Sequence, residues 1–163
     1  MVEPRWLSDK EQDTWRAFTY MRTELEAELE RRLERDGGLS AADYAILVPL
    51  SEAPGRKLRP RDLARIAGWE KSRLSHQIRR MESRGLVERQ ACPDDARGSV
   101  VKLTRRGYRA IVAAAPDHVE AVREYVIDAL SDSQLTALRR ISERILGRIR
   151  AGKESGDDGS DQG

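Results

Sequence analysis

The side chains best suited to chemistry lie between Gly68 and Gly85, where Ser, Arg and His recur. Leu74, Ile78 and Met81 have the i, i+4, i+7 spacing of a buried helical stripe. The opposite side of this helix would carry hydrogen-bonding and cationic side chains, namely Ser72, Arg73, Ser75, His76, Arg79 and Arg80. Arg can bond guanine through two hydrogen bonds, and Ser and His can bond bases or phosphates. The helix therefore suits a DNA major groove, although a solvated basic face would have the same composition.

A β-hairpin is expected after this helix, with strands at residues 86–89 and 100–103, where β-branched residues gather. Residues 92–99 between them are dense in turn-forming residues. Arg97 lies near the tip of this turn, where it could enter a narrow minor groove, and Asp95 could orient Arg97 by a charge-assisted hydrogen bond. The alternative is an ordinary hairpin tip with a surface ion pair of little energetic value.

A shorter helix is expected at residues 58–67, with Pro60 in its first turn. Gly68 would make the tight turn into the next helix. Short helix, glycine turn and second helix form a helix-turn-helix, whose second helix enters the major groove. The residues placed to contact phosphates are Arg59 and Arg61 on the first helix and Lys71 and Arg80 on the second.

The order and spacing of these motifs resemble the multiple-antibiotic-resistance-regulator (MarR) family over about residues 58–107. The resemblance rests on Leu63-Ala64, Gly68, Lys71-Ser72, Leu74-Ser75, Arg80-Met81-Glu82, Gly85-Leu86-Val87, Arg89, Asp95-x-Arg97-Gly98 and Leu103-Thr104-x-x-Gly107. It implies a mainly α-helical fold with a small β-wing. This would be a winged helix-turn-helix whose N- and C-terminal helices form a dimerisation layer.

The resemblance further implies a homodimeric, sequence-specific transcriptional regulator of repressor type. Each recognition helix would enter a major groove of a pseudo-palindrome, and each wing would reach the flanking minor groove. His76 stands where the family often carries Arg, so the base preference at that position stays open. A small, often aromatic effector ligand would release the DNA. Trp15, Tyr44 and Trp69 could lie near such a ligand, but core packing is favoured over ligand contact for each. For Trp15, packing against a second copy of the chain is slightly favoured over packing within one chain.

The flanking sequence predicts long helices around the DNA-binding lobe. The expected domain covers residues 5–152, with the lobe at about 40–107 and dimerisation helices at about 8–35 and 105–152. Helix starts are indicated by Ser8 with Glu11, Ser40 with Asp43, Thr104, and Ser131 with Gln134. Pro116 is expected to kink or split its helix. Residues 153–163 are rich in Gly, Ser and Asp and are expected to form a disordered acidic tail.

Positive charge is concentrated in the segment that carries the helix-turn-helix and the hairpin. Residues 56–110 hold sixteen Lys or Arg against six Asp or Glu, a balance of +10, although the whole chain carries only +2. Residues 1–55 hold seven against twelve, a balance of −5. This distribution is typical of a polyanion partner such as double-stranded DNA.

Composition and motifs weigh against a membrane protein and an enzyme. No apolar run is long enough to cross a bilayer, no signal peptide is recognisable, and a single cysteine fits a reducing cytoplasm. No nucleophile–base, metal-ligand or cofactor motif is recognisable, so neither a metal nor a cofactor is expected. Cys92 is interpreted as structural rather than as an oxidant sensor.

Two other function classes stay open at this point. A non-specific or architectural DNA-binding protein would bind with salt dependence but without base preference. A winged-helix protein-interaction module would use the same positive charge to bind an acidic protein.

Overall fold

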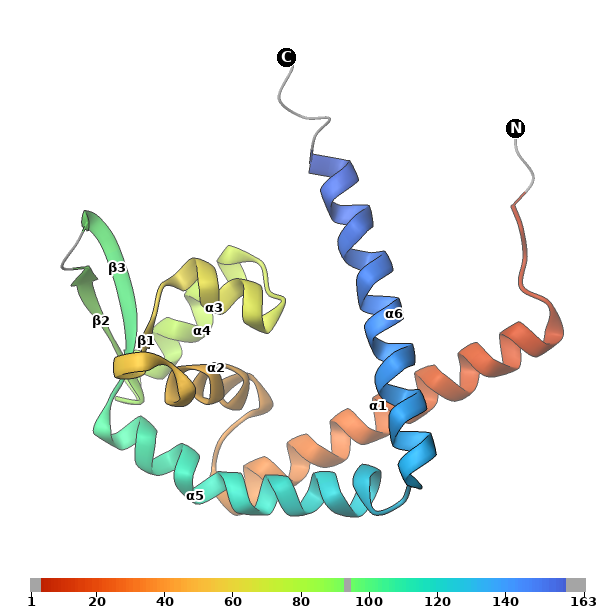
Figure 1. Cartoon of the computed structure of the whole chain (residues 1–163). Coiled ribbons are helices and arrows are strands. Elements are labelled where there is room, and N and C mark those ends of the chain that lie inside the picture. Colours follow the sequence, from red (N-terminus) through yellow and green to blue (C-terminus); the bar gives the residue numbers. More distant parts are fainter. Residues whose placement is uncertain (1–3, 93–94, 158–163) are drawn as a thin grey trace. The chain divides into compact units, whose positions relative to one another are not determined.

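The computed structural model of the chain describes residues 4–92 and 95–157, without the side chains of residues 36, 92, 95–98 and 153–157 (Figure 1). The elements are α1 (Asp9–Gly37), α2 (Ala41–Glu52), the 3-10 turn η1 (Pro54–Arg56), β1 (Lys57–Leu58), α3 (Pro60–Ala67), α4 (Lys71–Ser83), β2 (Val87–Cys92), β3 (Asp95–Leu103), α5 (Arg105–Val122), the π-helical turn η2 (Arg123–Ile127) and α6 (Asp132–Asp157). They form two compact units, one ending at Ala121 and one beginning at Val122. The predicted mainly α fold with a small β-wing is confirmed.

Side-chain capping fixes the starts of the long helices where the sequence indicated them. Ser8 and Glu11 form a capping box at α1, and Ser40 and Asp43 form one at α2. Each box satisfies backbone N–H groups that a first helical turn would otherwise leave unpaired. At α5, the hydroxyl of Thr104 accepts a hydrogen bond from the Gly107 N–H at 2.9 Å. Ser131 caps α6, with its own N–H bonded to Gln134 at 2.9 Å.

The wing is a three-stranded antiparallel sheet with the order β1-β3-β2. Its strands are longer than expected, so most of the predicted turn at residues 92–99 is strand in the structure. Ala91 pairs with Ser99, so the two strands stay paired within the segment whose composition had indicated a turn. Strand β1, which pairs Lys57 with Lys102, was not predicted because two residues show no hydrophobic period.

The helix-turn-helix consists of α3, the turn at Gly68, and α4. Gly68 has a φ of 67°, a left-handed conformation that glycine adopts without steric cost. The next residue, Trp69, donates its backbone N–H to the Ala64 carbonyl at 2.9 Å, which fixes the direction of the chain into α4. The core behind both helices is apolar and comprises Leu33, Leu39, Ile46, Leu47, Leu50, Leu63, Leu74, Ile78, Met81, Leu86, Val87, Val101, Leu103, Ile111 and Ala114.

Helix α5 begins against the hairpin at a very close approach. A Cβ added at Gly107 would lie 2.0 Å from the Leu86 carbonyl oxygen, so only glycine fits between α5 and the chain entering β2. Further along, Pro116 was expected to kink or split its helix; it lies inside α5, which is continuous to Val122, so the alternative of a split is wrong. A proline removes one backbone hydrogen bond, and the helix continues on the bonds that remain.

The second unit consists mainly of α6, which extends beyond the expected domain boundary at residue 152. The helix includes the first five residues of the expected tail, since Lys153 and Glu154 are good helix formers that continue the preceding turn. Residues 158–163 lie outside the described residues. Within the part of the chain that the structure describes, no helix has the length and apolarity needed to span a bilayer.

Candidate nucleic-acid interface

Helix α4 has one face fixed in the core and one face open to solvent. Leu74, Gln77, Ile78 and Met81 are buried, with exposed fractions of 6% or less. The predicted DNA-contacting residues on the other side are solvent-exposed, namely Lys71, Ser72, Arg73, His76, Arg79 and Arg80, whereas Ser75 is half-buried. The sequence-derived orientation of the helix is therefore the orientation in the structure, apart from the partial burial of Ser75.

The N-terminus of α4 carries features that favour an anion. The N-cap residue Glu70 makes no side-chain capping bond, and the first turn contains no acidic residue. Lys71 and Arg73 place cations there instead, although the positive end of the helix dipole disfavours cations. Uncapped N–H groups together with two cations form an electrostatic environment in which a phosphate would be stabilised.

A buried carboxylate holds α4 to the start of α2. Asp43, whose side chain is 1% exposed, accepts hydrogen bonds from Gln77 Nε2 at 2.8 Å and from Arg84 Nη1 at 2.6 Å. It also accepts the Ser40 N–H at 3.1 Å, and Arg84 Nη2 donates to the Gly38 carbonyl at 3.3 Å. Burying a carboxylate is tolerated when it is paired and hydrogen-bonded in this way. The network fixes the recognition helix against the α1–α2 junction.

Sequence reasoning missed Gln77 and Arg84, although one signal was present. Gln77 falls inside the apolar stripe of α4, three residues after Leu74, where an amide must find a partner once it is buried. The residue that satisfies it, Asp43, lies 34 positions earlier in the chain. No local pattern predicts a pair over that separation.

The remaining phosphate candidates lie on α3 and just before it. Arg61 is exposed on the first turn of α3, and Arg59 is the exposed N-cap residue of the same helix. Both therefore belong to the helix-turn-helix, as predicted, at the start of its first helix.

The wing can be described at its base. Arg89 on β2 pairs with Glu82 of α4 at 3.5 Å, and Lys102 on β3 lies 4.0 Å from Glu88. The side chains of Arg97, its predicted partner Asp95, and Cys92 lie outside the described residues. Their proposed roles in minor-groove contact, wing support and core structure therefore stay predictions.

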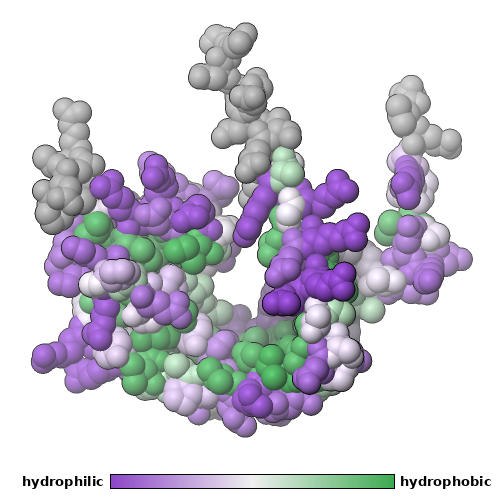
Figure 2. Space-filling model, in the orientation of Figure 1, coloured by the Kyte–Doolittle hydropathy of each residue, from purple (hydrophilic) through white to green (hydrophobic). Residues whose placement is uncertain are grey.

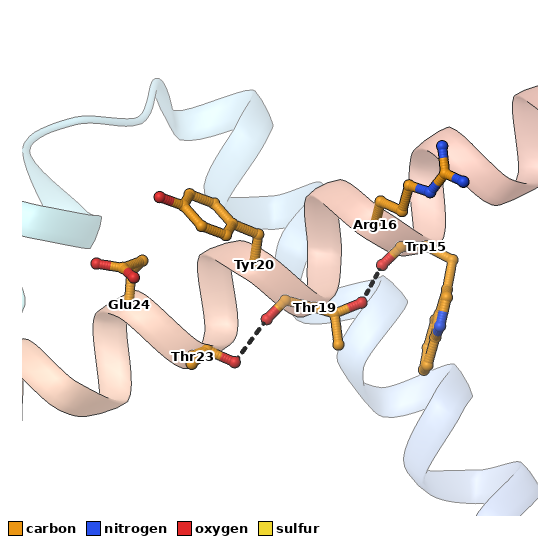
Figure 3. A pocket seen from close by; sticks show the side chains of 6 residues that line it. All are labelled: Trp15, Arg16, Thr19, Tyr20, Thr23 and Glu24. Carbon is orange, nitrogen blue, oxygen red and sulfur yellow. Dashed lines mark hydrogen bonds between the residues drawn. The ribbon is translucent and has the colours of Figure 1, made fainter.

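The three aromatic residues considered as ligand neighbours differ in environment. Tyr44 and Trp69 are half-buried against the core, as favoured. Trp15 is 57% exposed, so core packing within this chain is wrong for it, because α1 presents it to solvent. Figure 3 shows it at an open hollow along α1, lined by Trp15, Arg16, Thr19, Tyr20, Thr23 and Glu24.

Tyr44 meets a histidine from α5. The rings of Tyr44 and His118 are 4.3 Å apart between centroids, and His118 Nδ1 is a buried atom without a hydrogen-bond partner among the described residues. Burial lowers the pKa of His118 below its usual value of 6.5. Burial, and then the charge of Glu52, raises the pKa of Tyr44. Both side chains are therefore favoured in their neutral forms.

Comparisons with known proteins agree with this geometry. Residues 37–98 match the model of the MarR family, a span that contains the helix-turn-helix and most of the wing. The transcriptional regulator HosA of Escherichia coli O111:H- is 31% identical over 108 residues, which cover 66% of this chain and 78% of HosA.

Two solved structures from Streptomyces coelicolor are similar over nearly the whole chain. Sco3205, a MarR family transcriptional regulator crystallised in complex with DNA, is 42% identical, with a TM-score of 0.85 over 90% of this chain and 91% of Sco3205. AbsC, another MarR family transcriptional regulator, is also 42% identical, with a TM-score of 0.87 over 91% of this chain and 99% of AbsC. With its helix-turn-helix, its wing and these relatives, the chain belongs to the MarR family of DNA-binding transcriptional regulators.

Proposed function

We propose that the protein is a homodimeric, ligand-responsive repressor that binds a pseudo-palindromic DNA operator. The observation that carries this proposal is the exposed cationic and hydrogen-bonding face of α4, held by a buried face and by the Asp43 network. A similar protein at 42% identity, Sco3205, was crystallised with DNA. A regulator of chromosomal transcription would act in the bacterial cytoplasm and would not need catalytic groups.

Roles for the DNA-contacting residues follow from their places in the helix-turn-helix. Ser72, Arg73, Ser75, His76 and Arg79 are assigned to base edges in the major groove. Lys71, Arg80, Arg59 and Arg61 are assigned to phosphates, which fix the position of the protein on the duplex without reading sequence. Arg97 is assigned to the minor groove, with Asp95 as its support.

Exposed apolar residues on the long helices support a homodimer. In the first unit, α1 exposes Trp15, Phe18 and Met21, and α5 exposes Val112 and Val119. Figure 2 shows green hydrophobic surface among the purple along the lower part of this unit, where α5 lies in Figure 1. In the second unit, α6 exposes Leu138, Ile141, Ile145, Leu146 and Ile149. Apolar side chains in such numbers mark an interaction surface rather than scattered exposure. A second copy of the chain would bury them and place two recognition helices about one helical turn of DNA apart, roughly 10 base pairs.

The environment of Tyr44 and His118 supports an aromatic effector in the first unit. His118 Nδ1 is buried and has no hydrogen-bond partner among the described residues, so a phenolic hydroxyl would pair with it only in a state that opens the contact between His118 and Tyr44. The ligand must bind the state that cannot hold DNA better than the state that can, because otherwise it shifts no equilibrium.

Fluorescence anisotropy tests the proposal with a duplex from upstream of the protein's own gene and a scrambled duplex of equal composition. Measurements at two salt concentrations should show preference for the first duplex at both, and weaker binding to each at higher salt. Equal affinity for the two duplexes would instead favour a non-specific DNA-binding protein. No binding to either would favour a distant operator or a protein partner.

A further inference from the structure

The guanidinium of Arg73 is stacked on the indole of Trp69. The Arg73 Cζ atom lies 4.3 Å from the centroid of the Trp69 ring system. A cation over the face of a tryptophan is attracted by the electron density of the ring, more strongly than over phenylalanine. The stack links the turn of the helix-turn-helix with the first turn of the recognition helix.

Trp69 is itself held from two sides. Its backbone N–H is bonded to the Ala64 carbonyl at 2.9 Å, and the left-handed Gly68 fixes the preceding turn. Its ring is half-buried and packs against the core. A ring fixed in this way offers a rigid platform for the side chain four residues later.

The position of Arg73 is unfavourable for the stability of α4 alone. It lies in the first turn, where the positive end of the helix dipole disfavours a cation and where acidic residues are preferred. An arginine with several rotatable bonds would otherwise sample many orientations in solvent, and ordering it on binding would reduce the affinity. The stack restricts this freedom before DNA arrives.

We propose that Trp69 is a positioning residue that directs Arg73 toward one base pair, and so determines specificity without itself contacting a base. The inference rests on the proposed function, in which Arg73 reads the major groove. It assigns part of the base preference to a residue in the turn, outside the exposed face of α4.

The test is selection of binding sites from a randomised duplex library by the full-length protein and three variants. Arg73→Ala should reduce base discrimination at one position of each half-site by at least about fivefold, the lower range for a well-placed base contact. Trp69→Met, which keeps apolar volume without a ring, should reduce discrimination at the same position. Trp69→Phe, which keeps a weaker ring face, should give an intermediate loss.

Arg79→Ala is the matched control, and it should alter a different position. The inference is overturned if Trp69→Met lowers affinity for all sequences alike, or if it leaves the position affected by Arg73→Ala unchanged. Circular dichroism identifies a Trp69→Met protein that fails to fold, and Trp69→Phe then decides by the same criterion. A wild-type protein that selects no motif would contradict the proposed function itself, and the inference with it.

Discussion

The Asp43 carboxylate and the Arg84 guanidinium lie 2.6 Å apart, one at the start of α2 and the other just after α4. Arg84 also reaches the carbonyl of Gly38, where α1 ends. A single carboxylate thus connects the recognition helix with the junction of the two preceding helices. We expect a shift of that junction to strain these bonds to the helix assigned to the major groove.

Replacing Asp43 by Ala should lower the free energy of unfolding by about 2–4 kcal/mol, because Gln77 is then buried without a partner and Arg84 loses its ion pair. Arg84 is 40% exposed, which keeps the loss below that of a fully buried pair. Urea denaturation measures the effect. Asp13→Ala is the control. Asp13 forms an ion pair with Arg16, and because their side chains are 77% and 68% exposed, the pair should contribute less than about 1 kcal/mol to the free energy of unfolding. Equal losses in the two variants would contradict a structural role for the network.

Gly107→Ala should destabilise the protein by about 3 kcal/mol or more, because its Cβ would lie 2.0 Å from the Leu86 carbonyl oxygen. The backbone of α5 or of the hairpin would have to move. Gly147→Ala on α6 is the matched control, since nothing lies within 4 Å of its added Cβ. A helical Gly→Ala change of this kind should be stabilising by about 0.5–1 kcal/mol. Thermal denaturation should show a lower melting temperature for Gly107→Ala and a higher one for Gly147→Ala than for the wild type.

Arg79 and Lys71 should affect DNA binding in different ways. Arg79→Ala should weaken the free energy of binding to the preferred duplex by about 1–3 kcal/mol and relax the base preference at one position. Lys71→Ala should weaken all duplexes alike and reduce the salt slope by about one. Anisotropy titrations on preferred and scrambled duplexes measure both effects. If Arg79→Ala weakened every duplex equally, Arg79 would be a phosphate contact and its assignment to bases would be wrong.

The double variant Ile141→Glu, Ile145→Glu should shift the protein from dimer to monomer. Both side chains are about half exposed on α6, and burying an isoleucine stabilises an assembly by about 1.5–3 kcal/mol. Losing two in each chain, with added charge, should raise the dissociation constant more than a hundredfold. Analytical ultracentrifugation measures the mass. Ser142→Glu adds one negative charge on the same helix without removing an apolar side chain, and should leave the dimer intact. A dimeric double variant would place the interface elsewhere.

Acid should destabilise the protein through His118. Burial lowers its pKa in the folded state below the unfolded value of 6.5, so the unfolded chain binds a proton first as the pH falls. Neutral His118 makes its full contribution to the free energy of unfolding above pH 6.5. That contribution is lost as the pH falls through the lower pKa of the folded state. Urea denaturation should show that the free energy of unfolding decreases less between pH 7.5 and pH 5.5 in His118→Phe than in the wild type.

Local signals explain what the sequence could predict. The capping residues Ser8, Ser40, Thr104 and Ser131 all act where expected, because a cap and the helix it starts are adjacent in sequence. The outward face of α4 followed from the spacing of three apolar residues. The stack of Arg73 on Trp69 joins residues only four positions apart, but Trp69 lies in the turn before α4, so no helical spacing indicated it.

Features that depend on distant partners could not be predicted. Strand β1 exists because Lys57 meets Lys102, forty-five positions later, and two residues have no period of their own. The Asp43 network joins residues 34 and 41 positions apart. Pro116 was expected to kink or split its helix because a proline removes a backbone hydrogen bond. The helix α5 is not split, and it packs closely on α1, with an added Cβ at Gly37 2.7 Å from Ala114 Cβ.

The first backbone N–H groups of α4 have no side-chain acceptor in the free protein, because the start of the helix is uncapped. Its first N–H groups receive no side-chain cap from Glu70 and no acidic partner in the first turn. In free protein these amides should exchange hydrogen with solvent faster than the buried turns that follow. A DNA phosphate would supply the missing acceptor, so the nucleic acid would complete the helix as well as being recognised by it. Slowed amide exchange at this turn would then report operator occupancy directly.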